Sequence, residues 1–222
     1  MKDLRGTYVH YGDVLRRRRR VRAAVMVCGL VVAAVTAARN WEPTEAAAAA
    51  SAASVGDRVG LSEAQVAGLK GEQLGRWHSI YNFSRRFKIT TELSTAVYDA
   101  AVAEKIDPHL AFPLVRLESR FNEKAMSPVG AVGLTQLMVP TARMYVPGVS
   151  RDDLYDRDLN LTIGFRHLRS LIKEYRGNVQ LALLAYNRGG VAVELDRELG
   201  LDPSNGYDRI VLKGYKGKGV LD

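Results

Sequence analysis

The chain has 222 residues, of which 47% are hydrophobic, enough for one domain of ordinary size with a real core and some additional segments. A formal net charge of +8 is common among proteins that bind nucleic acid. Here, however, residues 1–22 contain eight Lys or Arg against two Asp, so the remaining 200 residues carry a net charge of only +2. This distribution argues against nucleic acid as a partner of the folded part.

The basic flank precedes an uncharged apolar run. Five consecutive arginines, Arg16 to Arg20, are followed by the run from Ala23 to Ala38. Positive charge before an apolar segment is typical of a membrane segment whose N-terminus stays in the cytoplasm. We therefore predict a cytoplasmic tail (1–20) and a signal anchor (21–38) that crosses the inner membrane once. The rest of the chain would lie in the periplasm or cell envelope. The alternative is a cleaved signal peptide and a secreted product, since Val35-Thr36-Ala37 offers small residues for cleavage.

Cysteine and histidine usage limits the chemistry of the exported part. The single cysteine, Cys28, lies inside the apolar run, so no disulfide can form beyond it. The four histidines are scattered, with no pair at ligand spacing. We therefore predict no metal and no other cofactor. The histidines are His10, His78, His109 and His167.

Two segments separate the apolar run from the predicted domain. Residues 39–60 are rich in alanine and are interpreted as a spacer. Residues 61–90 form a helical lead-in, since Ser62-Glu63-Ala64-Gln65 matches a capping box. Its apolar residues recur at helical spacing, which predicts an amphipathic helix that packs on the domain and could also dock a partner protein.

From residue 91 onward the periodicity is helical, and a single helical domain is placed at 91–222. The first helix is expected over 91–105 with Thr91 as its N-cap. Asp107-Pro108 begins the next, with Asp as N-cap and Pro at the first helical position. Pro113 lies inside that second helix and is expected to kink it.

Further helices are expected beyond the second one, and no segment is predicted to be a strand, which indicates an all-α fold. Arg188-Gly189-Gly190 should end the most apolar helix. The basic stretch at 213–218 is expected to be a solvated end. The further helices are expected to begin at Pro140 and to cover 161–175 and 179–187, with an acidic turn at 152–158.

One carboxylate stands out. Glu118 has Leu114 one turn before it and is flanked by Leu117 and Phe121. Apolar surroundings disfavour the anion, so its pKa should be raised and the group could act as a general acid. The alternative is a surface glutamate paired with a neighbouring cation, Arg116, Arg120 or Lys124.

The segment after Glu118 favours the catalytic interpretation. Residues 127–138 form an uncharged run that is punctuated by glycine, as expected where a backbone must approach another group closely. Ser127, Gln136 and Met138 would then line a cleft beside Glu118.

Several motifs in order resemble the lytic transglycosylases of the soluble-lytic-transglycosylase (SLT) type. These motifs read E-S-x-F-N from Glu118, A-x-S-P-x-G-A-x-G-L-x-Q-L-M from Ala125, N-L-x-x-G-x-x-x-L from Asn160 and A-Y-N-x-G from Ala185. The resemblance extends from about Leu93 to Leu212 and implies a lysozyme-like all-α domain.

The resemblance implies an activity on peptidoglycan. The β-1,4 bond between N-acetylmuramic acid and N-acetylglucosamine would be cleaved with formation of a 1,6-anhydro end. Glu118 would be the single acid and base. The matching substrate-binding residues are Ser119, Ser127, Gln136, Met138, Tyr186 and Asn187.

The sequence also departs from this family and leaves alternatives open. Met138-Val139-Pro140 shifts the family's Met-Pro by one position, and Pro203-Ser204-Asn205-Gly206 stands where many relatives carry a Glu-Thr pair. A hydrolytic muramidase on the same fold is one alternative. An inactive peptidoglycan-binding accessory of an envelope-spanning machine is another, with a protein partner on residues 61–87.

Overall fold

The computed structural model describes residues 63–221, with side-chain detail from residue 68. The chain divides into a first unit that ends at Ser79 and a second unit, Ile80–Asp222. The long helix α3 (Glu63–Phe87) contains the boundary, so its last eight residues belong to the second unit. The predicted anchor, the linker and Ser62 of the capping box lie outside the described residues. Within residues 63–221, no helix is both long and apolar enough to cross a membrane.

The second unit continues with two helices whose ends the sequence marks clearly. Helix α4 (Thr91–Ala103) is capped by Thr90, whose side-chain oxygen accepts a hydrogen bond from the Leu93 N–H. The predicted cap, Thr91, was therefore wrong by one position, because the residue with extended backbone is Thr90. Helix α5 (Pro108–Ser119) is capped by Asp107, as predicted, and contains Pro113.

Four helical segments follow the loop after α5. Asp156 caps the long helix α7 through the Leu159 N–H, and Asn178 caps α8 through the Leu181 N–H. The acidic residues at 152–158 therefore lie in or beside the first turns of two helical segments. The segments are α6 (Val139–Arg143), the 3₁₀ turn η2 (Asp152–Tyr155), α7 (Arg157–Glu174) and α8 (Val179–Arg188).

Two C-terminal helices were not anticipated as helices. Gly189 ends α8 with φ of 84°, as predicted, but the chain immediately begins α9 (Gly190–Glu198). Helix α10 (Tyr207–Val211) follows Gly206, whose φ of 89° suits glycine. No strand occurs among residues 63–221, so the all-α prediction is confirmed for the part that the structure describes.

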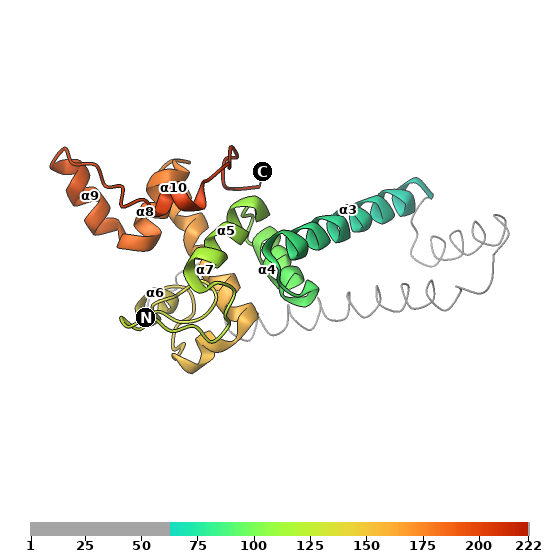
Figure 1. Ribbon diagram of the computed structural model, residues 1–222, viewed down its shortest axis with the longest axis horizontal. Coiled ribbons are helices and arrows are strands. Elements are labelled where there is room, and N and C mark those ends of the chain that lie inside the picture. The colour runs from blue at the N-terminus through green and yellow to red at the C-terminus, as the bar shows by residue number, and fades with distance from the viewer. Residues whose placement is uncertain (1–62, 222) are drawn as a thin grey trace, which may run out of the picture. The chain divides into compact units, whose positions relative to one another are not determined.

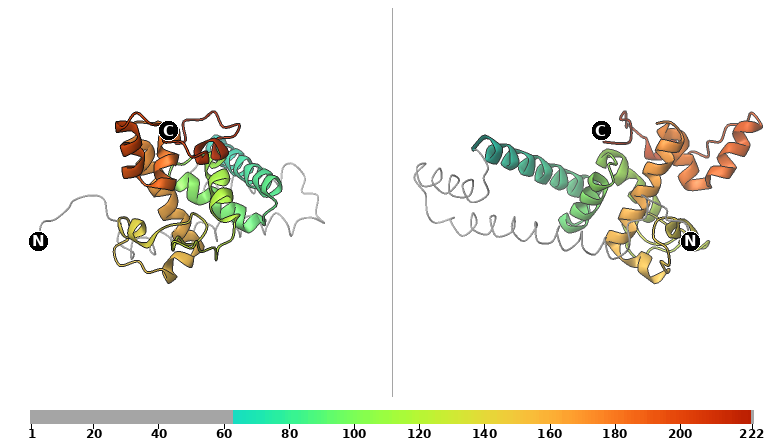
Figure 2. Two further views of the ribbon diagram at one scale, coloured as in Figure 1. Left: turned by 60° about the vertical axis from the view of Figure 1, so that its left-hand side comes forward. Right: turned by 180° about the vertical axis from the view of Figure 1, so that it is seen from behind.

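The helices of the second unit enclose a shared apolar core. Helix α4 packs on α5 and α7, α7 packs on α8, and α10 contacts both α5 and α8 (Figure 1). The segment between α5 and α7, yellow-green to yellow in Figure 2, gathers beside the start of α7 over a second apolar cluster that includes Val132, Leu137 and Ile163. Short helix α10 therefore stands where it can place side chains against both α5 and α8.

Candidate active site

Glu118 lies in the last turn of α5 and is largely shielded from solvent. Burial raises the pKa of its carboxyl group, and a hydrogen bond from Tyr207 partly offsets this effect. The Tyr207 hydroxyl donates this short hydrogen bond to Oε1 of Glu118. No ion pair joins Glu118 to Arg116, Arg120 or Lys124 among the described side chains, so the surface-pair alternative is not what the structure contains.

Tyr207 is positioned by the turn that begins α10. The Asn205 side-chain oxygen accepts a hydrogen bond from the Tyr207 N–H at 3.1 Å, and the neighbouring Asp208 is fully buried. The Asp208 carboxylate accepts hydrogen bonds from Gln180 Nε2 at 2.7 Å and from Ser204 Oγ at 2.8 Å. These contacts fix α10 to α8, so the Tyr207 phenol is held against Glu118 by a buried polar network.

A second tyrosine lies close to the same carboxylate. The Tyr186 hydroxyl, from α8, donates to the backbone oxygen of Thr135 at 2.8 Å. Burial, followed by the nearby charge of Glu118, raises the pKa of the Tyr186 phenol. Burial also raises the pKa of the Tyr207 phenol, so both tyrosines are neutral at pH 7 and remain hydrogen-bond donors.

His167 lies behind Tyr186, with their ring centroids 5.4 Å apart. Its Nδ1 is 3.0 Å from the Tyr145 hydroxyl. Burial lowers the pKa of His167 to about 4, so the ring is neutral at pH 7. It belongs to the support behind the candidate site and does not supply a charge.

The loop after α5 is fixed to α7 by one buried asparagine. Asn160 Oδ1 accepts hydrogen bonds from the Thr135 N–H at 2.9 Å and from Thr135 Oγ1 at 2.7 Å. Its Nδ2 donates to the backbone oxygens of Val132 and Leu154 at 2.9 and 3.0 Å. All four hydrogen bonds join α7 to the loop or to η2, so the Asn160 amide fixes these segments to one another.

Two glycines are required by this close packing. A Cβ on Gly133, whose φ is 77°, would lie 2.3 Å from Asn160 Nδ2. A Cβ on Gly164 would lie 2.3 Å from Thr135 Oγ1. The glycine-punctuated backbone was expected to approach another group closely. In the structure, that group at Gly133 is the Asn160 side chain.

Three residues predicted to bind sugar are found on this loop or at its end. The Ser127 Oγ accepts a hydrogen bond from the Ala131 N–H at 3.0 Å. The Gln136 Nε2 donates to the Gly133 oxygen at 2.9 Å, and its backbone has a left-handed φ of 48°. Met138 is the N-cap residue of α6 and is 38% exposed. Ser127 and Gln136 thus brace the loop, and their role toward a ligand stays a prediction.

The two other predicted binding residues differ in their surroundings. Ser119, next to Glu118, is buried, and its hydroxyl donates to the Val115 oxygen and accepts from the Phe121 N–H. It therefore ends α5. Asn187 is exposed and accepts a hydrogen bond from Asn205 at 2.8 Å, which links α8 to the turn that carries Tyr207.

The nearest carboxylate along the chain is engaged elsewhere. Glu123 lies 3.7 Å from Arg157, which also pairs with Glu92 and Asp158. Lys124, the next residue along the chain, lies over the ring of Tyr155. Residues 68–221 contain no cluster of His, Cys, Asp and Glu that could hold a metal ion.

Sequence reasoning overlooked Tyr207, Thr135 and His167. Tyr207 was assigned no role from the sequence, where it lies 89 positions after Glu118. Nothing local in the sequence links it to an acid in α5, because the contact depends on how α10 returns to that helix.

The comparisons with known proteins agree with this architecture. The family model "Transglycosylase SLT domain" matches residues 96–199. The soluble lytic murein transglycosylase of Escherichia coli K12 is 36% identical over 92 residues, 39% of this chain and 14% of that protein. The transglycosylase of Enterobacteria phage PRD1 is 40% identical over 90 residues, 40% of this chain and 32% of that protein.

Among solved structures, the 70-kDa soluble lytic transglycosylase of Escherichia coli matches 59% of this chain and 24% of its own, with 29% identity and a TM-score of 0.48. The chain therefore spans about a seventh of the Escherichia coli K12 relative and about a third of the phage relative. The matched segment contains Glu118, the glycine-punctuated loop and Tyr186, but it ends before Tyr207. Residues 96–199 thus match a transglycosylase SLT domain, and the residues that the structure describes have the all-α fold that the resemblance implied.

Proposed function

We propose that the protein is a peptidoglycan lytic transglycosylase that cleaves the β-1,4 bond between N-acetylmuramic acid and N-acetylglucosamine. The observation that supports this proposal is the buried carboxyl group of Glu118, which accepts a hydrogen bond from the Tyr207 hydroxyl. The names of the relatives support murein as the substrate class.

Glu118 first acts as the general acid. Because burial raises its pKa, the carboxyl stays protonated to higher pH than an exposed glutamate. Tyr207 donates to Oε1, so the proton resides on the other oxygen, Oε2. That proton passes to the glycosidic oxygen as its bond to the anomeric carbon breaks.

The resulting carboxylate then acts as the base. It accepts the proton of the muramoyl C6 hydroxyl while the C6 oxygen bonds to the anomeric carbon, which gives the 1,6-anhydro end. Intramolecular attack has a high effective molarity, so no second carboxylate is needed to hold a water or form a covalent intermediate. The Tyr207 hydrogen bond stabilises the anion between the two steps.

The proposal is tested with Glu118→Gln, using Glu123→Gln as the matched control because Glu123 pairs with Arg157 away from the candidate acid. We expect Glu118→Gln to abolish release of anhydromuropeptides from isolated sacculi. Glu123→Gln should keep nearly full release. Undiminished release by Glu118→Gln would refute the role of this carboxyl.

Analysis of the same products distinguishes two alternatives to the proposed function. A muramidase would give reducing ends, which are heavier than anhydro ends by one water. An inactive accessory protein would bind sacculi and release nothing. The buried Glu118–Tyr207 pair favours an active enzyme, since an idle site has no need to keep a desolvated acid.

The proposed location is the periplasmic side of the inner membrane, with the segment at 21–38 as anchor. Its support is the arginine run before an uncharged apolar segment. Fractionation of cells that express the full chain should place it in the membrane pellet. Release of a shortened soluble form would instead favour signal cleavage.

A further inference from the structure

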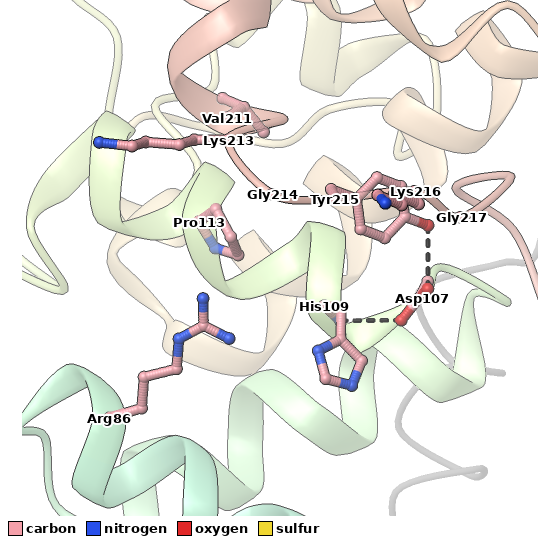
Figure 3. A pocket seen from close by; sticks show the side chains of 10 residues that line it. All are labelled: Arg86, Asp107, His109, Pro113, Val211, Lys213, Gly214, Tyr215, Lys216 and Gly217. Carbon is pink, nitrogen blue, oxygen red and sulfur yellow. Dashed lines mark hydrogen bonds between the residues drawn. The ribbon is translucent and has the colours of Figure 1, made fainter.

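A cavity lies in the second unit, beside the end of α5 that is opposite to Glu118. Its volume is about 300 Å³, the lower end of the range for small-ligand sites. Figure 3 shows its lining, in which Arg86 comes from α3, His109 and Pro113 from α5, and Lys213 and Lys216 from the segment after α10. Three cationic side chains and one carboxylate, Asp107, surround it.

The C-terminal wall of this cavity is fixed to the fold. The Tyr215 hydroxyl donates to Asp107 Oδ2 at 2.9 Å (Figure 3). It also accepts a hydrogen bond from the Gly219 N–H at 2.8 Å. Gly219 is buried, and a Cβ there would meet Val179 at 2.9 Å. The basic stretch at 213–218, expected to be a solvated end, is therefore held between two anchor points beside the start of α5.

The cations of the cavity are not used inside the protein. No ion pair within the described residues involves Arg86, Lys213 or Lys216. The guanidinium of Arg86 lies only over the Phe87 ring, 5.4 Å from its centroid. By contrast, Arg85 is hydrogen-bonded to Tyr81. The uncommitted positive groups favour an anionic ligand, which a guanidinium can bind through two parallel hydrogen bonds.

The remaining lining favours a peptide over a phosphate polymer. Asp107 already accepts hydrogen bonds from Tyr215 and from the His109 N–H, but a carboxylate has further acceptor sites. Its charge would repel a dense polyanion and would attract an ammonium group. Pro113 and the Tyr215 ring add apolar surface. A short peptide with carboxylates, an amine and small apolar groups matches all of these features.

The cavity does not share a face of α5 with the candidate acid. Pro113 and His109 precede Glu118 by five and nine residues, which is about 1.4 and 2.5 turns of helix. Both therefore face away from the side of α5 that carries Glu118. A ligand held here would therefore lie on the opposite side of α5 from the candidate acid.

We infer that this cavity binds the carboxylates of a peptidoglycan stem peptide on a neighbouring strand and so holds the enzyme on the cross-linked wall. The inference rests on the proposed function for its substrate class. It differs from the candidate active site in place, in ligand and in the measurement that tests it.

The test is sedimentation of the full chain with sacculi, in uncharged detergent and in the Glu118→Gln background so that no cleavage occurs. The variant is Arg86→Gln/Lys213→Gln/Lys216→Gln. The control with the same charge change is Arg85→Gln/Lys105→Gln/Lys173→Gln, which lies outside the cavity. Three exposed charge contacts, each worth roughly twofold, predict about tenfold weaker binding by the cavity variant and little change in the control. Equal binding by both variants would overturn the inference.

Calorimetry then identifies the ligand, using a synthetic stem tetrapeptide with free carboxylates, its amidated form, and glycerol phosphate. We expect binding of the free-carboxylate peptide alone, and loss of that binding in the cavity variant. Binding of glycerol phosphate instead, or of no probe, would overturn the peptide assignment. When Glu118 is left unchanged, the cavity variant should still cleave soluble glycan strands that lack cross-links. The binding measurements therefore test the inference about the cavity, and the cleavage measurement tests the catalytic proposal separately.

Discussion

The contact between Tyr207 and Glu118 gives the sharpest mechanistic prediction, through the variant Tyr207→Phe. Phenylalanine keeps the buried ring and removes only the hydroxyl that donates to Oε1 of Glu118. A hydrogen bond to an ionised group contributes roughly 1.5–3 kcal/mol. If the bond mainly stabilises the carboxylate formed after the first proton transfer, its loss should lower kcat by about 10- to 100-fold.

The same variant should change the pH dependence in a defined direction. The hydrogen bond from Tyr207 lowers the pKa of Glu118, against the larger effect of burial. Its removal therefore raises that pKa further. Because Glu118 must begin protonated, the alkaline arm of kcat/KM should move to higher pH in Tyr207→Phe.

The assay is release of anhydromuropeptides from soluble glycan strands between pH 4 and 9. Tyr215→Phe is the control, since its hydroxyl donates to Asp107 at the other end of α5. The control should leave the alkaline arm in place. Wild-type kcat in Tyr207→Phe, or an alkaline arm that moves to lower pH, would refute the reasoning.

Three further predictions concern stability. Glu118→Gln should unfold at a higher temperature than wild type at pH 7, since a carboxyl with a raised folded-state pKa destabilises the fold above the unfolded value of 4.5, and calorimetry should find the difference vanishing below that pH. Burial lowers the folded-state pKa of His167 from 6.5 to about 4, so the wild-type protein should lose on the order of 3 kcal/mol of unfolding free energy as pH falls between these values. His167→Gln should not show this loss in urea unfolding. An unchanged pH slope in the variant would contradict this. Gly133→Ala should lower the free energy of unfolding by about 2–5 kcal/mol in the same assay, because of left-handed backbone strain and displacement of Asn160. Gly130→Ala, with open space around it, should lower it by only about 1–2 kcal/mol. Equal losses in the two variants would contradict the role of packing at Gly133.

Local signals in the sequence predicted the helices well. Asp107-Pro108 was placed correctly because an N-cap oxygen and a first-turn proline act within three residues of each other. Helix α9 was missed because Gly189 and Gly190 were interpreted only as an end. In the structure Gly189 ends α8 and also stands at the N-cap of α9.

The acid of the candidate site was accessible from the sequence, and its partner was not. Glu118 has apolar neighbours within one helical turn, so its desolvation could be argued locally. The pairing with Tyr207 depends on the packing of α10 against α5, and the pairing of Asn160 with Thr135 spans 25 residues. Such contacts are set by tertiary packing, which periodicity does not encode.

The surroundings of Ser119 illustrate a different limit. The residue follows the acid in the motif, as in the family it resembles, and the resemblance implied a binding role. In the structure its hydroxyl is committed to the end of α5, at Val115 and Phe121. A motif records which residues occur together, but it does not separate those that hold the helix end from those that would meet a sugar.

The central claim is that one carboxyl, Glu118, serves as both acid and base. Mass spectrometry of the products that the full chain releases from sacculi tests it most directly, with Glu118→Gln and Glu123→Gln in parallel. The account predicts 1,6-anhydro ends from wild type and Glu123→Gln, and no release from Glu118→Gln. Reducing ends, one water heavier, or continued release by Glu118→Gln would contradict it.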